Sequence, residues 1–268
     1  MYYLIGVNEP EMRNLATFLS KMGYLVCCHE SEKNETVKHI FTNKSCSESM
    51  IAVKGERVVE DDFKLVEARN VNLKIYSYLQ VIDFIIKKHK TIIVFGENVF
   101  LSILLANVLD DLKGCNCIIG ENKIAADKKN IYMVLNIIGK LTEKPKYVII
   151  ESGHLNQFIV EHKEILNKTE KIIFADGDNQ EMNIDLIRPI FLYGLDKKND
   201  IFVQELKKSK KGYVFDVMIE DGYYGHFDLP IKAKSDINAV LAVISICAYE
   251  RFLAKDVSRV LKKYLKKG

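Results

Sequence analysis

The chain has 268 residues, of which 48% are hydrophobic and 28% are charged, and its formal net charge is +3. This composition is typical of a soluble globular protein with one or two domains, and so small a charge gives no reason to expect nucleic acid as a partner. The sequence has no apolar run of the roughly 18 residues that a membrane-spanning helix needs, and it begins without the basic segment of a secretory signal. We therefore expect a cytoplasmic protein with no membrane partner.

The six cysteines contain no CxxC pair, so we expect reduced thiols. Cys115 and Cys117 could form one edge of a metal site, but no second pair of Cys or His lies at a zinc-like spacing, and a buried strand is favoured. Few prolines, no tryptophan and abundant Lys, Ile and Asn resemble an AT-rich bacterial coding bias.

The first ninety residues alternate between strand and helix patterns. Apolar residues at helical spacing over residues 9–22 lie between the short apolar runs 2–7 and 24–28, which predicts a strand–helix–strand unit. The polar segment that follows contains one short predicted helix. The remaining predictions for this half are that short helix at 36–41, strands at 50–53 and 74–76, and helices at 61–68 and 79–88.

Gly6 ends the first predicted strand, where a dinucleotide-binding fingerprint GxGxxG would begin. Asn8 and Glu11 occupy the other two glycine positions, so the pattern predicts a strand–turn–helix rather than a working fingerprint. His29 follows the second strand, where a Rossmann-like domain often contacts a ribose or a uridine. The alternative for His29 is an ordinary surface histidine.

Residues 90–109, KTIIVFGENVFLSILLANVL, predict a buried strand at 91–95, a tight turn at Gly96 and an apolar helix from Val99. A strand, a glycine turn and a helix N-terminus can hold a phosphate through free N–H groups. A P-loop reads GxxxxGK[ST]. Counted from Gly96, its second glycine, lysine and hydroxyl positions are Leu101, Ser102 and Ile103. The shape of the loop is therefore predicted without its phosphate-binding side chains.

The rest of the chain continues as alternating strands and helices and ends in short strands and two helices. We predict an α/β protein with two Rossmann-like domains, residues 1–88 and 89–268, divided at the polar segment 87–90. The predicted strands are 117–119, 147–150, 171–175 and 189–193, then 201–206, 212–219 and 225–229 as an antiparallel ribbon, and the predicted helices are 131–141, 157–166, 236–251 and 256–264.

Ligands of α/β sheets bind at the carboxyl ends of the strands. Glu151 and His154 follow one predicted strand and could contact a ligand there, or form a solvated strand end. Asp176, followed by Gly177 and Asp178, comes after the next strand and could bind a cation or a ribose, although a plain turn is favoured. In the glycine turn, backbone N–H groups of Gly96, Glu97 and Asn98 could bind an anion, but the Glu97 carboxylate would repel phosphate.

The order of elements and two segments resemble the Mur ligases. In that family the central domain begins with an apolar strand and GTxGKTT, which corresponds to IIVFGENVFLS at residues 92–102. It ends with G-x-F-x-L-P and a helix that begins N-A-x-x-A, which correspond to residues 225–230 and to the helix from Asn238. The resemblance covers most of residues 1–264. Within the family the alanine-adding type, UDP-N-acetylmuramate–alanine ligase, is the most similar.

The chain departs from the family at the residues that handle ATP. In the register of the resemblance, Phe100 stands at the lysine that holds ATP phosphates, and Ser102 provides the one hydroxyl left for a metal. Glu151 corresponds to a family glutamate that binds Mg²⁺. The Arg-His-Asn that precedes the final family helix reads Ala-Lys-Ser at 233–235, and the chain ends where the family's third domain would begin.

These departures lead to two hypotheses. The resemblance and its losses predict a catalytically incompetent Mur-ligase-like protein that binds a UDP-sugar precursor of peptidoglycan, a nucleotide or a protein partner. The alternative is an ATP-dependent UDP-N-acetylmuramate–L-alanine ligase whose missing domain comes from a separate chain. ATP and Mg²⁺ would be its cofactors, with Ser102, Glu151 and His154 sharing the metal and phosphate roles.

Overall fold

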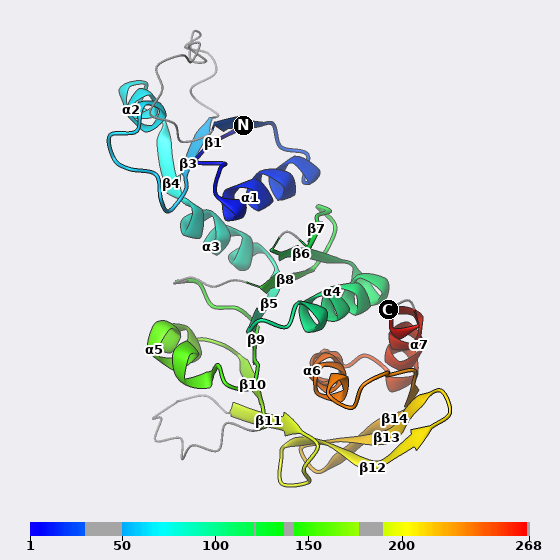
Figure 1. The fold of residues 1–268 in the computed structure, drawn as a ribbon. Coiled ribbons are helices and arrows are strands. Elements are labelled where there is room, and N and C mark those ends of the chain that lie inside the picture. The colour runs from blue at the N-terminus through cyan, green and yellow to red at the C-terminus, as the bar shows by residue number, and fades with distance from the viewer. Residues whose placement is uncertain (30–49, 121, 137–141, 177–189, 267–268) are drawn as a thin grey trace.

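A computed structural model describes residues 1–29, 50–120, 122–136, 142–176 and 190–266. Its first half is a parallel four-stranded sheet with the strand order β2-β1-β3-β4 (Figure 1). Helix α1 follows β1, and helices α2 and α3 follow β3 and β4. The elements are β1 (Tyr2–Ile5), α1 (Pro10–Lys21), β2 (Val26–His29), β3 (Ile51–Lys54), α2 (Phe63–Asn70), β4 (Lys74–Ser77) and α3 (Tyr78–Lys88).

Two of these helices begin at side chains that cap them. The Asp62 carboxylate accepts hydrogen bonds from the backbone N–H groups of Lys64 and Leu65 at the start of α2. At the start of α3, Ser77 and Gln80 exchange hydrogen bonds in a capping box. Such caps satisfy N–H groups that have no partner within the helix, so the local sequence sets where each helix begins.

The second half is a ten-stranded sheet with the order β14-β13-β12-β11-β10-β9-β5-β8-β6-β7. Its central strands are parallel, and β7, β13 and β14 run antiparallel to their neighbours. The elements are β5 (Lys90–Phe95), α4 (Val99–Lys113), β6 (Cys115–Ile119), β7 (Lys123–Ala125), β8 (Tyr132–Asn136), β9 (Tyr147–Ile150), α5 (Leu155–Leu166), β10 (Lys171–Ala175), β11 (Ile190–Gly194), β12 (Ile201–Ser209), β13 (Gly212–Ile219), β14 (Gly222–Leu229), α6 (Asp236–Tyr249) and α7 (Ala254–Leu265).

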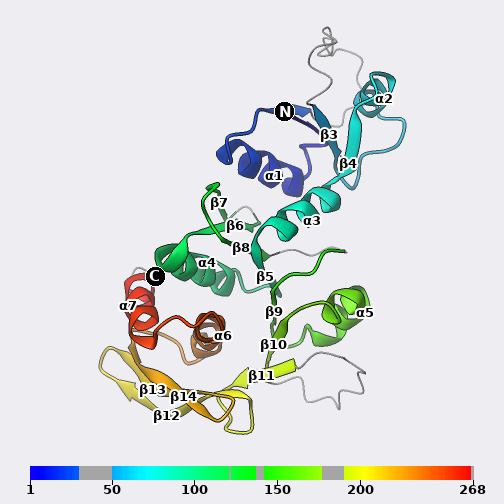
Figure 2. The same ribbon diagram turned by 180° about the vertical axis from the view of Figure 1, so that it is seen from behind.

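Helices cover both faces of the large sheet, with α4, α6 and α7 on one side and α5 on the other (Figures 1 and 2). Successive side chains of a strand point to opposite faces, and β5 shows this alternation. Ile92 and Val94 join the core beside α4 and α6, whereas Ile93 and Phe95 join the core beside α5. Strands buried on both faces explain the continuous apolar runs in the sequence.

The two sheets share an apolar core. Residues of β1, α1 and α3 belong to the same buried cluster as inner residues of β5, β8, β9 and β10. Helix α3 connects the last strand of the small sheet to the first strand of the large one. Because this core crosses the junction, the division into domains 1–88 and 89–268 stays a prediction.

The α/β architecture and the late antiparallel ribbon are confirmed, but one predicted helix is wrong. Residues 132–136 form strand β8, which pairs with both β5 and β6, instead of a helix over 131–141. The segment is continuously apolar because alternate residues face the two cores, and such a run does not distinguish a short helix from a buried strand. The predicted helix at 36–41 lies outside the described residues.

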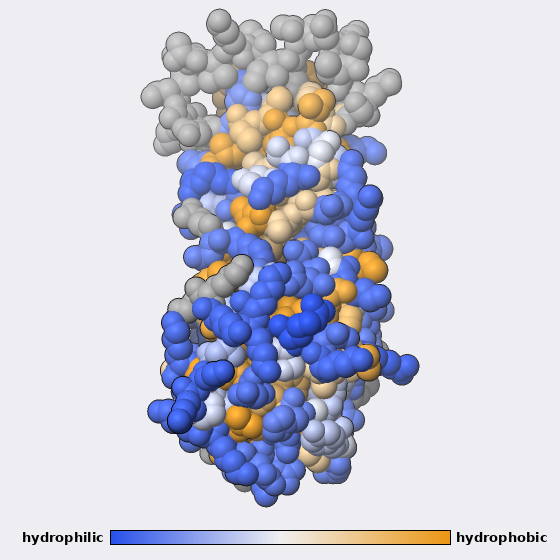
Figure 3. Space-filling view, turned by 90° about the vertical axis from the view of Figure 1, so that its right-hand side faces the viewer, coloured by the Kyte–Doolittle hydropathy of each residue, from blue (hydrophilic) through white to orange (hydrophobic). Residues whose placement is uncertain are grey.

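Figure 3 shows one flank of the molecule, on which hydrophilic residues dominate around the large sheet and apolar residues are more frequent towards the small sheet. Large apolar side chains that are exposed in the first half include Leu25, Val59 and Phe63. Within the described ranges, we find no helix with the length and hydropathy that crossing a bilayer requires.

Candidate functional site

The glycine turn predicted at Gly96 lies between β5 and α4. Gly96 has φ +150°, a value that favours glycine. Asn98 begins α4, and its side chain accepts a hydrogen bond from the Leu101 N–H at 3.1 Å. The turn therefore has the predicted strand–turn–helix form, at the carboxyl edge of the parallel strands where α/β proteins bind ligands.

A carboxylate of the protein itself lies against this turn. Glu151 follows β9, the strand next to β5, and its Oε2 accepts the backbone N–H of Asn98 at 3.0 Å. A Cβ atom placed on Gly96 would collide with the same carboxylate. The side chain of Glu151 thus occupies the space over the glycine turn, where an exogenous anion would bind.

The environment of Glu151 is partly buried and holds little positive charge. Burial raises the pKa of Glu151, and the N–H of Asn98 and the nearby imidazole of His154 act in the opposite direction. The carboxylate of Glu97, in the same turn, raises this pKa further. Phe100, at the position of the expected lysine, is 41% exposed. This loop lacks the fixed cation on which phosphoryl transfer relies.

Three buried oxygen atoms of predicted site residues have no hydrogen-bond partner among the described residues. They are Glu151 Oε1, Ser102 Oγ in α4 and Asn238 Oδ1 in the first turn of α6. Carboxylate, hydroxyl and amide oxygens are the donors that Mg²⁺ accepts. The donor types fit such an ion, but Glu151 is the one acidic group among them, and no cluster of three or more His, Cys, Asp or Glu suited to a metal occurs in the described part of the chain.

Two other predicted site residues lie at or near the turn. His154 directly precedes α5, donates its backbone N–H to the Glu151 carbonyl at 3.2 Å and packs its ring edge-on to Phe95 at 6.0 Å. Glu97 is part of the turn, and it is exposed. The sequence placed Glu97 in the glycine turn and His154 after the strand that precedes Glu151, and the structure has them at these positions.

Asp176 lies apart, after β10, and serves the neighbouring loop. Its carboxylate accepts a hydrogen bond from Asn199 Nδ2 at 3.1 Å and lies 3.9 Å from Lys198 Nζ. Its backbone N–H bonds to the Tyr193 carbonyl at 2.7 Å. These contacts hold the β11–β12 connection against β10, as a structural turn residue does. The predicted partner Asp178 lies outside the described residues.

In the first half, two N–H groups of the Gly6 turn are already bonded within the protein. The N–H groups of Gly6 and Val7 both bond to the carbonyl of His29, at 2.8 and 3.1 Å. The His29 ring packs on Tyr3 at 4.8 Å, and burial followed by the charge of Lys64 lowers the pKa of His29. The two predicted site residues therefore contact each other, because the Gly6 N–H donates to the backbone carbonyl of His29.

Glu9, which the sequence reading did not single out, repeats the arrangement of Glu151. Glu9 is 6% exposed, and its carboxylate accepts the backbone N–H groups of Glu56 and Arg57, each at 3.1 Å. A Cβ atom on Gly55, directly after β3, would collide with it. The one sequence signal was Gly55 itself, a glycine at the carboxyl end of a strand. At two strand ends, then, the protein fills its own anion-binding N–H groups with a glutamate.

Known proteins with a similar structure are Mur ligases and related enzymes. No family model matches the sequence. The UDP-N-acetylmuramate:L-alanyl-γ-D-glutamyl-meso-diaminopimelate ligase of Neisseria meningitides superposes with a TM-score of 0.68 and 14% identity, over 97% of each chain. The UDP-N-acetylmuramate–alanine ligase of Thermotoga maritima gives 0.69 and 16%, over 98% of this chain and 68% of that one.

A pseudomurein ligase shows the same likeness at a lower score. The type C pseudomurein peptide ligase of Methanothermus fervidus gives a TM-score of 0.57 at 13% identity, over 98% of this chain and 70% of its own. At such identities the likeness establishes the fold rather than the activity. The structures thus confirm the resemblance seen in the sequence: this chain has the fold of the Mur ligases.

Proposed function

We propose that this protein acts in peptidoglycan precursor metabolism as a Mur-ligase-fold protein that does not transfer phosphoryl groups. The observation that carries the proposal is the Glu151 carboxylate, which accepts the Asn98 N–H and lies over Gly96. A negatively charged side chain in this position repels a nucleotide phosphate and takes one of its hydrogen-bond donors. Phe100, in place of a lysine, removes the charge that would offset this repulsion.

The ligand that we propose is a UDP-linked sugar precursor, bound at the carboxyl edge of the small sheet. This choice is supported by the Neisseria and Thermotoga neighbours, both of which are named as ligases of UDP-N-acetylmuramate. The Gly6 and Val7 N–H groups already bond to the protein. Binding must therefore use side chains and the uracil or sugar groups more than the Gly6 turn.

A thermal-shift series tests this proposal with ATP–Mg²⁺, UDP-N-acetylmuramate and UDP-N-acetylglucosamine. A ligand that binds only the folded state adds about 2.7 kcal/mol of stability at a hundred times its Kd. We expect a shift with a UDP-sugar and none with ATP–Mg²⁺. A shift with ATP–Mg²⁺ would contradict the proposal that the Gly96 turn does not bind a nucleotide phosphate. No shift with any ligand would reject the UDP-sugar in favour of a protein partner.

A variant tests whether the Glu151 carboxylate prevents anions from binding at the Gly96 turn. Glu151→Ala removes the internal carboxylate and frees the Asn98 N–H, so inorganic pyrophosphate should bind measurably better than to the wild type. The control is Glu161→Ala, which removes one negative charge from the exposed side of α5. Equal gains in the two variants would mean that net charge, rather than the occupied turn, sets the affinity.

The second candidate function is the ATP-dependent ligase, completed by a separate chain. It is favoured by the partnerless oxygens of Glu151, Ser102 and Asn238, whose types suit Mg²⁺. Mg²⁺ bound at Glu151 would neutralise phosphate charge, and Glu151 would have to leave Asn98. Release of phosphate from ATP that depends on UDP-N-acetylmuramate and alanine would establish this function.

A further inference from the structure

We propose a second binding site, for a small dianion such as a phosphate group, in a cavity of about 450 Å³ at the amino-terminal edge of the large sheet. The cavity lies between the α3–β5 junction, residues 86–90, and two connections, residues 143–146 and 168–170. Its volume is within the range of small-molecule sites, roughly 300–1,000 Å³. It is distinct from the Gly96 turn, because strands β5 and β9 begin at this edge and end at the other.

Two lysines in the wall of the cavity are held in place from behind by Glu250. The Glu250 side chain is 4% exposed, and its oxygens accept Lys90 Nζ at 2.9 Å and Lys146 Nζ at 2.6 Å. The hydroxyl groups of Tyr132 and Tyr147 bond to the same carboxylate, at 2.5 and 2.8 Å. An ammonium group has three N–H donors, so each lysine keeps donors for a ligand while its position is fixed.

The rim of the cavity is also fixed. The buried Asp83 of α3 accepts the backbone N–H groups of Thr142 and Glu143, at 3.1 and 3.0 Å. This contact ties the connection before β9 to the same helix whose last turn forms the opposite wall. Two of the three chain segments are thus held at a fixed spacing by hydrogen bonds, which lowers the cost of ordering a ligand.

The charge of the lining selects an anion. Five lysines line the cavity, against Glu143 and Glu170 in its wall and Glu250 behind it, which leaves an excess of two positive charges. Lys87 is 70% exposed and only 4.0 Å from Glu143, and Lys144 and Lys168 have no ion pair among the described residues. Lysines recognise phosphate as point charges, so a dianion with phosphate chemistry matches this excess.

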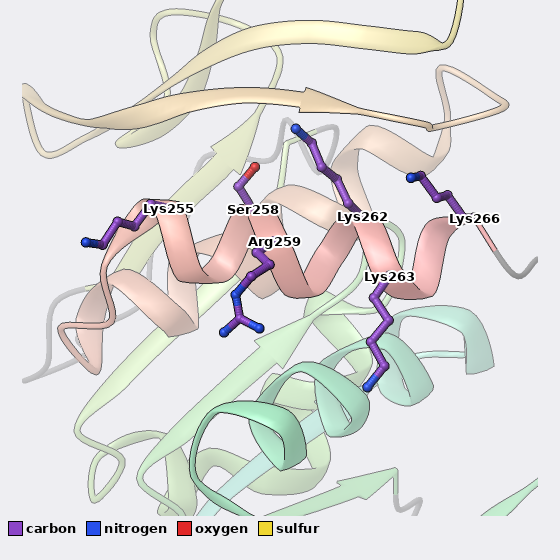
Figure 4. Close-up of a pocket in the computed structure, with 6 residues that line it drawn as sticks. All are labelled: Lys255, Ser258, Arg259, Lys262, Lys263 and Lys266. Carbon is purple, nitrogen blue, oxygen red and sulfur yellow. The ribbon is translucent and has the colours of Figure 1, made fainter.

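The other basic surface of the protein lacks such walls. A hollow along α7 is lined by five side chains of that helix and by Lys266 directly after it; the five are Lys255, Ser258, Arg259, Lys262 and Lys263. Figure 4 shows that Arg259 and Lys263 extend towards α4, whereas Lys262 extends towards the antiparallel ribbon of β12, β13 and β14. The cations therefore diverge. Lys263 also pairs with Asp111, at 2.5 Å. This face can attract anions in general and serves as the control surface.

The test is an NMR titration of the full chain with inorganic phosphate, read from backbone amide shifts. We expect saturable shifts confined to residues 86–90, 143–146 and 168–170, of which Pro145 has no amide proton to observe. The double variant Lys144→Ala/Lys168→Ala should weaken binding about tenfold, because two exposed charge contacts are lost. The matched control Lys255→Ala/Lys262→Ala changes net charge equally and should stay within about twofold.

Lys144→Arg/Lys168→Arg should retain binding, since both charges persist. The proposal is overturned if the shifts do not saturate, if they centre on the Gly96 turn, or if both alanine variants weaken binding equally. The inference does not depend on the function of the Gly96 turn, because it concerns the opposite edge of the sheet.

Discussion

The Glu250 network allows a stability prediction that can be worked out from the structure. Glu250 caps the end of α6, and its buried carboxylate accepts hydrogen bonds from Lys90, Lys146, Tyr132 and Tyr147. These partners begin or precede three parallel strands, β5, β8 and β9. The substitution Glu250→Gln keeps the shape of the side chain and removes its charge.

The expected magnitude follows from the pKa of Glu250. Burial alone would raise this pKa, but the hydrogen bonds, that from Lys146 first, lower it to about 2 from the ordinary value of 4.5. A difference of this size corresponds to about 3 kcal/mol of folding stability. Because the pKa of the folded state is depressed, this stability is present above about pH 4.5 and disappears as the pH falls towards 2.

Urea unfolding at pH 7 and across acidic pH measures this effect. Glu250→Gln should lower the free energy of unfolding by about 3 kcal/mol at pH 7, and the two proteins should converge near pH 2. The control Glu205→Gln changes an exposed pair with Lys207 and should cost less than about 1 kcal/mol. A loss below 1 kcal/mol for Glu250→Gln, or a loss that does not change with pH, would refute the network's role.

Three further substitutions test other contacts. Gly96→Ala should lower the free energy of unfolding by about 1 kcal/mol or more, because its φ is +150° and its Cβ meets Glu151. Glu151→Ala in the same chain should recover part of this loss in urea unfolding, and full additivity would contradict the contact. Burial lowers the pKa of His162, whose ring nitrogens have no hydrogen-bond partner among the described residues, so stability should fall as the pH drops below about 6.5. His162→Phe should remove that slope between pH 5 and 7.5, and a slope that persists would assign it to another group. Glu9→Ala leaves two amide N–H groups without their acceptor and should cost about 1–3 kcal/mol in urea unfolding, whereas no change would mean that water replaces the carboxylate.

Much of the fold could be predicted because local patterns and tertiary packing agree. Residues 9–22 have apolar positions at helical spacing, and α1 occupies Pro10–Lys21. The strand before Gly96 and the helix after it are also as predicted. Strand β8 was missed because the apolar run is shaped by two neighbouring strands and two cores, which a local pattern does not reveal.

The candidate site was predicted in its parts but not in its contacts. Gly96 and Glu151 were both expected at the carboxyl edge of the sheet, since parallel strands end together there. That the Glu151 carboxylate turns into the loop depends on the pairing of β5 with β9, which brings together residues more than fifty positions apart. Glu9 and Glu250 were missed for the same reason, because their partners come from distant segments.

The most direct test of the account is calorimetric titration of the wild-type chain with ATP in the presence of Mg²⁺. The central claim is that Glu151 fills the anion position of the Gly96 turn and that no lysine compensates for its charge. The account predicts no Mg²⁺-dependent binding of ATP at physiological concentration. Binding of ATP in the micromolar range would contradict it and would favour the ligase.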